Sequence, residues 1–398
     1  MKVLVINCGS SSLKFQLIDM QTEKTLVSGI CDRIGLEGSV LNYKKDGVKT
    51  EKKEAIPDHS KAVSMVLDAL TDKEIGVISS LEEIAAVGHR TVHGGEHFKE
   101  SVLIDENVIK HMEECSVLAP LHNPANITGI RACQKLMPNT PMVGVFDTAF
   151  HQTMPPKAFT YGVPYEWYEK YKVRRYGFHG TSHKYVSQRT AEFLGLDYHN
   201  SKIITCHLGN GSSIAAIKNG ECIDTSMGLT PLEGLIMGTR SGDLDPGILE
   251  YISEKEGISV KEVVNILNKK SGVLGISGLS SDFRDLLDAD LKGNERAKLA
   301  RAAFAYRVVK YIGSYCAVLI GVDAISFCAG VGENANFIRG MIVDHLEFLG
   351  VKLDTEANKV CGQEAIISTP NSRVKVCVIP TNEELVIARD TKTIVSQL

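Results

Sequence analysis

The 398-residue sequence has no excess of positive charge, no long uninterrupted apolar run and no CxxC pair among its ten cysteines. A net charge of −4 gives no support for binding to nucleic acid or to a membrane surface, since either would require a basic patch. The longest apolar region, YCAVLIGVDAISFCAGVG, contains Asp323 and several glycines, so it is too interrupted to span a bilayer. Several cysteines lie inside apolar runs, and we expect buried thiols in a reducing compartment, the cytoplasm, rather than disulfides.

Signatures of two common classes of nucleotide-binding protein are also missing. The sequence has no GxxxxGK[ST] loop and no HRD or DFG triplet, which excludes P-loop and protein-kinase interpretations. The segment GVGENA at residues 330–335 fits the dinucleotide pattern GxGxxA, but it lacks the usual strand–helix unit in front of it. We interpret it as a nucleotide contact, and a dinucleotide-dependent oxidoreductase stays open only as an alternative that depends on this segment.

One pattern occurs twice. The segment VLVINCGSSSLKFQLIDM, from residue 3, is typical of a strand, a small polar turn and a second strand, and IITCHLGNGSSIAAIKNGECIDTS, from residue 203, has the same order. Backbone N–H groups and hydroxyls in such a turn can lie along a polyphosphate without a helix, because small side chains let the backbone approach. The recurrence predicts a diverged duplication with two related domains. A plain hairpin turn is the alternative for each copy taken alone.

The fold class follows from the order of the elements. Segments such as SKAVSMVLDALTD and ERAKLARAAFAYRVVKYIGSYCAVLIG have helical apolar spacing, and short strand-like runs such as IAAVGHR, PMVGVFD and VKVCVIP lie between helices. A few antiparallel strands followed by alternating helices and strands predict an α/β fold with mixed sheets. We expect the domain boundary near the proline-rich segment HQTMPPKAFTYGVP.

Charged residues follow several of the predicted strands or stand in glycine-rich loops. Arg90 and Asp147 follow buried strands, and open α/β sheets bind ligands at such ends. His179 precedes a predicted helix, Arg240 stands in the loop GLIMGTRSGDLDPG, and Glu383 begins a helix. Together they suit phosphoryl transfer, which needs positioned positive charge and Mg²⁺. A surface ion pair for Arg90 and simple helix capping for Glu383 are the alternatives.

Three histidines have a spacing that can indicate a metal site. His89, His93 and His97 follow one another at intervals of four, as ligands on a helix do. However, Gly94 and Gly95 would break a helix, and the preceding residues predict a strand. We therefore do not expect these three side chains to bind one metal ion.

The motifs NCGSSSLKF, GHRTVHGG, APLHNPAN, FDTAFH, RRYGFHGTSH, HLGNGSS, TPLEGLIMGTRSGDLDPG, SDFRD, GVGEN and TNEE occur in order along the chain. In this combination the sequence resembles the acetate kinase family, within the superfamily of sugar kinases, Hsp70 and actin. The resemblance implies two duplicated actin-like ATPase domains around a cleft, each a mixed sheet flanked by helices. The expected domains are residues 1–150, joined by the C-terminal helix 384–398, and residues 151–383. It also implies a homodimer.

The resemblance further implies roles for the matching residues. Mg²⁺, or Mn²⁺, would be held by Asn7 and Glu383. The expected catalytic residues are Arg90, Asp147 as the catalytic carboxylate, and His179 and Arg240 as stabilisers of the transferring phosphoryl group. The substrate-binding residues would be Arg90, Val92, Leu121, His122, Phe178 and Pro231. The nucleotide would contact Lys14, His207, Leu208, Gly209, Asn210, Gly211, Asp282, Phe283, Arg284, Gly330, Val331, Gly332, Glu333 and Asn334.

The implied reaction is direct in-line transfer of a phosphoryl group from ATP to acetate, giving acetyl phosphate and ADP. Propionate or another short-chain carboxylate is the close alternative, because one methylene in an apolar pocket changes the free energy by only about 1–3 kcal/mol. A non-catalytic, nucleotide-switched protein is an alternative of another class, and it would not need Arg90, Asp147, His179 and Arg240 together.

Overall fold

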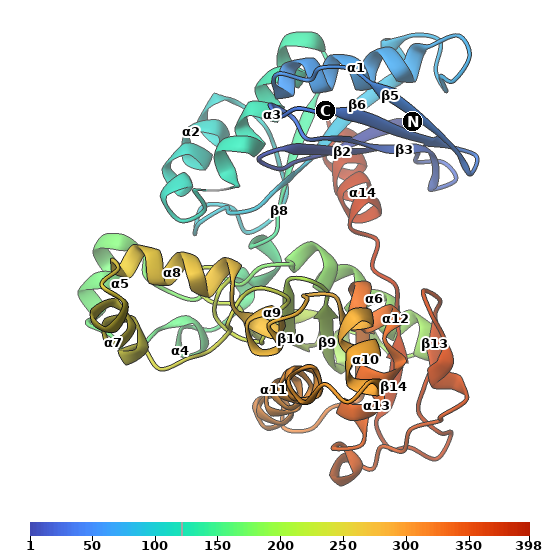
Figure 1. The fold of residues 1–398 in the computed structure, drawn as a ribbon. Coiled ribbons are helices and arrows are strands. Elements are labelled where there is room, and N and C mark those ends of the chain that lie inside the picture. Colours follow the sequence, from blue (N-terminus) through green and yellow to red (C-terminus); the bar gives the residue numbers. More distant parts are fainter. Residues whose placement is uncertain (121) are drawn as a thin grey trace. The chain divides into compact units, whose positions relative to one another are not determined.

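The computed structural model describes residues 1–120 and 122–398. The chain divides into two compact units, each built around its own sheet (Figure 1). Unit 1 comprises Met1–Phe150 and Asn382–Leu398, and unit 2 comprises His151–Thr381. The predicted α/β class with mixed, helix-flanked sheets is confirmed.

Unit 1 contains an eight-stranded sheet in the order β5-β4-β3-β2-β1-β6-β8-β7. β1 pairs antiparallel with β2 and parallel with β6, and β6 is parallel to β8. The predicted strand–turn–strand at the start of the chain is therefore the β1–β2 hairpin. The strands are β1 (Lys2–Cys8), β2 (Ser12–Asp19), β3 (Lys24–Asp32), β4 (Val40–Lys45), β5 (Val48–Lys53), β6 (Ile84–Thr91), β7 (Val102–Leu103) and β8 (Met142–Phe146).

Alternate residues of β1 belong to different cores, as the period of two in a strand requires. Leu4 and Ile6 belong to the core that includes the buried face of α1, whereas Val3 and Val5 belong to the core formed with α14. Helices cover both faces of the central strands, which explains why β1 is a continuous apolar run. The helices of unit 1 are α1 (His59–Thr71), α2 (Glu106–Glu114), α3 (Asn123–Leu136) and α14 (Glu383–Val395), with 3₁₀ turns η1 (Leu81–Glu83) and η2 (Cys115–Val117).

The sheet of unit 2 repeats this topology in six strands, β11-β10-β9-β12-β14-β13. β9 pairs antiparallel with β10 and parallel with β12, as β1 does with β2 and β6. The second predicted strand–turn–strand is thus the β9–β10 hairpin. The strands are β9 (Lys202–Leu208), β10 (Ser212–Lys218), β11 (Glu221–Thr225), β12 (Ala324–Cys328), β13 (Ala365–Ile366) and β14 (Lys375–Val378).

The 25-residue helix α11 packs its buried side chains into the main core of unit 2, together with β9 and β12. α6 contributes Val186 to a smaller cluster with Cys328 and Cys377. Within residues 1–120 and 122–398, no helix combines the length and apolar composition needed to cross a bilayer. The helices of unit 2 are α4 (Pro156–Phe159), α5 (Tyr165–Tyr171), α6 (Gly180–Leu194), α7 (Gly247–Glu256), α8 (Val260–Lys269), α9 (Gly272–Ser277), α10 (Phe283–Leu291), α11 (Glu295–Leu319), α12 (Ala329–Asn334) and α13 (Asn336–Val343); the 3₁₀ turns are η3 (Ala149–Thr153), which begins in unit 1, η4 (Tyr198–Asn200), η5 (Glu347–Leu349) and η6 (Ala357–Lys359).

The contact between β6 and α14 depends on Gly88. A methyl group at Gly88 would lie 2.5 Å from Thr391 Oγ1 and 2.6 Å from Ile387 Cγ2, both on α14. We expect Gly88→Ala to lower the free energy of unfolding of unit 1 by about 1–3 kcal/mol, since overpacking a tight contact forces shifts. The matched control is Gly313→Ala within α11, where a methyl group meets nothing within 4 Å. It should be neutral or stabilising by up to about 1 kcal/mol, because alanine favours helix. Urea denaturation compares the two variants, and equal midpoints would contradict the packing argument.

Candidate functional site

Unit 1 gathers four of the predicted site residues around one small pocket. Asn7 at the end of β1 lies directly opposite Lys14 on β2, and Arg90 stands near the end of the parallel neighbour β6. Glu383 is the first residue of α14. These four side chains line the pocket together with Val5, Phe15, Glu384 and Ile387. The residues meet because β1 and β6 are parallel and end at the same edge of the sheet.

Arg90 and Asp147 form a bidentate ion pair across the ends of β6 and β8. Arg90 Nε donates to Asp147 Oδ1 at 3.3 Å, and Nη2 donates to Oδ2 at 2.7 Å. Glu383 Oε2 lies 3.7 Å from Arg90 Nε. Burial alone would lower the pKa of Arg90, but the carboxylates of Asp147 and Glu383 outweigh it and raise that pKa. Arg90 Nη1 has no acceptor among the described residues, so one edge of the guanidinium is open to a ligand.

The segment after β6 is held by two buried asparagines of α3. Val92 N–H donates to Asn126 Oδ1 at 3.1 Å, and Asn126 Nδ2 donates to the carbonyl of Cys8 at 2.8 Å, which ties the ends of β6 and β1 together. Asn123 exchanges two hydrogen bonds with the backbone of His93. Val92 is 8% exposed. His122 is the N-cap residue of α3, and Leu121 lies outside the described residues.

Unit 2 brings the second glycine turn beside two predicted catalytic side chains. A methyl group at Gly211 would lie 3.3 Å from Arg240 Nη1 and 3.5 Å from His179 Nε2. The turn is closed by a hydrogen bond from Gly209 N–H to the carbonyl of Gly211, and the carbonyl of Asn210 accepts from Gly238 N–H at 2.9 Å. Arg240 Nη1 donates to the carbonyl of Pro231 at 3.4 Å. The turn, His179, Arg240 and Pro231 are therefore neighbours.

Arg240 is a half-buried cation that lacks an acidic partner. Burial lowers its pKa, and no carboxylate of residues 1–120 or 122–398 forms an ion pair with it. By contrast, Arg175 in the same unit is paired with Glu233 at 2.6 Å. A guanidinium without a counter-charge, beside a small polar turn, is suited to bind an anion such as a phosphate group.

His179 has a backbone conformation that is uncommon for a non-glycine residue, with φ of 56° and ψ of 23°. Its Nδ1 is hydrogen-bonded to Ser213 Oγ at 2.8 Å, and its ring stacks on His207 with centroids 4.1 Å apart. Ser213 Oγ is also hydrogen-bonded to His183 Nε2 at 2.7 Å. Burial lowers the pKa of His183 well below its usual value. The neutral, buried His183 thus fixes the position of Ser213 Oγ. Ser213 in turn orients the imidazole of His179, whose Nε2 faces the turn of residues 209–211.

Phe178 directly precedes His179 and is buried, and its carbonyl is hydrogen-bonded to His151 Nε2 at 2.9 Å. Leu208 is fully buried at the end of β9 and belongs to the core of the unit. The backbone around both residues is therefore fixed by core packing. The expected apolar pocket for a methyl group, with Phe178 and Pro231 in its wall, stays a prediction.

The segment of residues 330–334 forms most of the short helix α12 and lies close to the turn. A methyl group at Gly209 would be 3.6 Å from Ala329 Cβ. Arg339, which is fully buried, donates from Nη1 to the carbonyls of Gly332 and Glu333, both at 2.9 Å. Its remaining nitrogens donate to Asn358 and Val360. One arginine therefore holds the predicted nucleotide segment in place from inside the core.

The last predicted nucleotide-binding segment, residues 282–284, is not connected to the turn of residues 209–211 in the same way. Asp282 caps α10, and Arg284, whose side chain is 87% exposed, pairs with Asp282 at 2.6 Å. Phe283 is buried against Phe304, with ring centroids 4.7 Å apart. Among residues 1–120 and 122–398, no hydrogen bond or ion pair joins these three residues to that turn. Their role stays a prediction.

Sequence reasoning missed three supporting residues, namely Asn126, Ser213 and Arg339. Asn126 and Ser213 belong to the quoted motifs APLHNPAN and HLGNGSS, so a role for them could have been proposed. Arg339 had no such signal, because nothing local distinguishes a buried arginine from an exposed one on a helix.

The chain matches the Acetokinase family over residues 2–389. It is 78% identical to an acetate kinase of Helicobacter hepaticus, with 100% of both chains covered, and 61% identical to an acetate kinase of Thermotoga maritima, again over 100% of both. The crystal structure of Porphyromonas gingivalis acetate kinase is similar with a TM-score of 0.96, 52% identity and 99% of each chain covered. A propionate kinase from Francisella tularensis matches with a TM-score of 0.92 and 46% identity, covering 98% of this chain and 99% of that one. The chain belongs to the acetokinase family.

Proposed function

We propose that this protein transfers a phosphoryl group between ATP and acetate, giving acetyl phosphate and ADP in a reversible reaction. The observation that carries the proposal is Arg240, a half-buried guanidinium without an acidic partner that lies beside the 209–211 turn and His179. Full-length similarity to acetate kinases supports the choice of acceptor. The proposal includes the residue roles below and the assignment of units 1 and 2 as the two related domains.

The proposed chemistry needs charge stabilisation more than proton transfer. A carboxylic acid is ionised at neutral pH, so acetate is already a nucleophile and needs no general base. A metaphosphate-like transition state spreads negative charge over its equatorial oxygens, which Arg240 and His179 would stabilise. Asp147 then acts as a positioning residue for Arg90, whose open Nη1 edge would bind the carboxylate or acetyl phosphate. This refines the expected role of Asp147 as a catalytic carboxylate.

A divalent cation fits the donors in unit 1. Asn7 and Glu383 line one pocket and offer an amide oxygen and a carboxylate, which are ligands that Mg²⁺ prefers. Mg²⁺, or Mn²⁺, bound there would neutralise phosphate charge. Lys14 lines the same pocket and would add a fixed positive charge for a phosphate group.

We extend the proposal to ATP and ADP binding in unit 2, to a cytoplasmic location and to a homodimer. The turn of residues 209–211 and the segment held by Arg339 would contact the nucleotide, with Asp282, Phe283 and Arg284 as further contacts. Nine of the ten cysteines are buried and none is paired, which suits a reducing compartment. Light scattering of the purified protein gives its molar mass, which distinguishes the proposed homodimer from a monomer.

A hydroxamate assay with acetate, ATP and Mg²⁺ tests the proposed function, because acetyl phosphate reacts with hydroxylamine to give acetohydroxamate, which forms a coloured complex with Fe³⁺. We expect product that depends on all three components. ATP hydrolysis without hydroxamate would contradict the proposal and favour a nucleotide-switched protein. No nucleotide turnover would also contradict it. Repeating the assay with propionate measures the activity toward the alternative substrate. This comparison is included because the chain is also similar to a propionate kinase.

Arg240 provides the sharpest test of mechanism. Arg240→Ala should lower kcat by roughly 10³-fold, the scale at which a transition-state arginine contributes. Arg240→Lys should also be strongly impaired, because lysine lacks the planar fork. Arg131→Ala removes an exposed arginine paired with Glu106 on unit 1 and should leave kcat unchanged. Near-normal turnover in a folded Arg240→Ala variant would remove this residue from the reaction.

Val92 tests the acceptor pocket. It is almost fully buried beside the end of β6, and its backbone is fixed by Asn126. Val92→Ala should raise kcat/KM for propionate relative to acetate, by up to the ~10–200-fold that one methylene supplies. Val117→Ala, at a site 82% exposed, is the matched control and should leave the ratio unchanged. An unaltered ratio in Val92→Ala would show that Val92 does not limit the pocket.

A further inference from the structure

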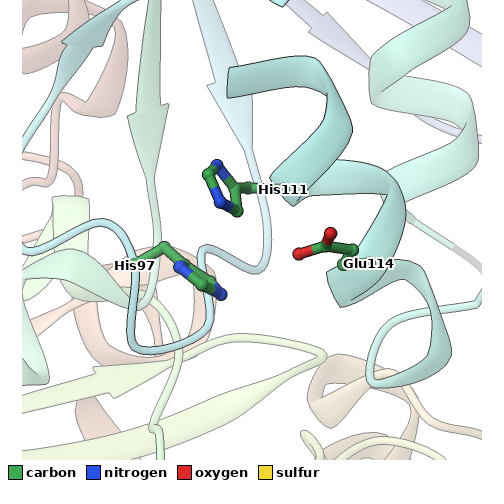
Figure 2. Close-up of side chains that lie close together, drawn as sticks. All are labelled: His97, His111 and Glu114. Carbon is green, nitrogen blue, oxygen red and sulfur yellow. The ribbon is translucent and has the colours of Figure 1, made fainter. Parts of the chain in front are cut away.

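A cluster of potential metal ligands lies in unit 1 among residues that the proposed reaction does not use. His97, His111 and Glu114 each offer one ligand atom, and these atoms all lie within 4.8 Å of one another. Figure 2 shows His111 and Glu114 on the helix α2 and His97 on the facing loop. Sequence reasoning placed His97 with His89 and His93, which lie in and just after β6 and are buried. The loop instead brings His97 to α2.

Two ligands come from one helix by simple spacing. His111 and Glu114 are three residues apart on α2, so their side chains emerge from the same face. Asp105 precedes the helix and caps it, because its side chain accepts a hydrogen bond from Val108 N–H at 2.8 Å. Val108, Ile109 and Met112 are buried, which fixes the rotation of the helix and leaves Glu114 exposed and His111 half-buried.

The third ligand is fixed by its neighbours in the loop. Phe98 is buried and stacks on Phe146 of β8, with ring centroids 4.3 Å apart and planes 8° apart. Gly95 packs closely against Cys115 at the end of α2, because a methyl group there would lie 2.7 Å from Cys115 Sγ. These contacts place the loop against α2, and the rings of His97 and His111 stack with centroids 4.3 Å apart.

We propose that His97, His111 and Glu114 form a surface site for a divalent transition-metal ion, with Zn²⁺ as the ion of choice. Two imidazoles and one carboxylate are a donor set that zinc accepts, with a water molecule in the fourth position. Tetrahedral coordination needs ligand atoms ~3.4 Å apart, given metal–ligand distances near 2.1 Å. The three ligand atoms lie within 4.8 Å of one another, and rotation of the exposed side chains of His97 and Glu114 would bring them to the shorter separation.

The donor set also separates this site from the proposed Mg²⁺ ligands. Imidazole nitrogen suits zinc, copper and nickel, whereas Mg²⁺ requires oxygen ligands. Bound zinc would link α2 to the loop that continues β6 beyond Arg90 and Val92. Asn123 already connects these segments, since its Nδ2 donates to the carbonyls of His93 and Met112. The inference does not depend on the proposed function.

Calorimetric titration with Zn²⁺ tests the site in the full-length protein. The background variant is Cys361→Ser, because Cys361 is the exposed cysteine and its thiol could also bind zinc. Excess Mg²⁺ is present throughout to fill oxygen-ligand sites. We expect one saturable zinc ion per chain, and His97→Ala and His111→Ala should each weaken its affinity at least ~10-fold, since even residues that only support a ligand change affinity by 10–100-fold.

Glu114→Gln should also weaken zinc binding, whereas Glu113→Gln changes the neighbouring exposed carboxylate outside the cluster and should alter the affinity less than about twofold. Thermal unfolding without zinc confirms that each variant is folded. His97 is exposed, so its alanine variant keeps the fold even if His111→Ala does not. Absence of saturable binding, or an affinity in His97→Ala equal to that of the background, would overturn the proposal.

Discussion

The ion pair between Arg90 and Asp147 is the interaction on which the organisation of unit 1 depends. It joins the ends of two parallel strands, β6 and β8, and Asp147 is only 2% exposed. A buried carboxylate is costly unless it is paired and hydrogen-bonded, and the bidentate contact with Arg90 meets that need. The same contact leaves the Nη1 edge of Arg90 open. Structure and proposed function therefore depend on the same contact. The positive charge of Arg90 offsets the cost of burying the Asp147 carboxylate, and the contact with Asp147 orients Arg90 so that Nη1 can bind a ligand.

The topology explains why polar residues gather at these positions. In each unit an antiparallel hairpin adjoins a parallel strand, as β1–β2 adjoins β6 and β9–β10 adjoins β12. The turn of each hairpin therefore lies beside the carboxyl end of a parallel strand. This arrangement brings a glycine turn next to functional side chains without a helix N-terminus. It also accounts for the absence of a P-loop in a protein that we propose uses ATP.

Both hairpins and the positions of Arg90 and Asp147 could be predicted from the sequence, because the patterns that indicate them are local. The period-two pattern of β2 and the repeated turn indicated both hairpins, and the carboxyl ends of strands indicated Arg90 and Asp147. The remaining features depend on contacts between residues far apart in the sequence. Arg339 reaches the carbonyl of Val360, and His97 meets His111 across a loop. No periodicity or spacing encodes such partners, so only the folded chain shows them.

A double-mutant cycle on Arg90 and Asp147 tests the central interaction most directly. Arg90→Met, Asp147→Asn and the double variant are compared in kcat/KM for acetate and in unfolding by urea. If Asp147 acts through Arg90, each single variant should lose activity, and the double variant should be no worse than Arg90→Met alone, with a coupling of about 1 kcal/mol or more. In unfolding, the double variant should be more stable than Arg90→Met, which removes the bidentate cationic partner of a buried carboxylate. Independent losses that multiply in the double variant would contradict the account.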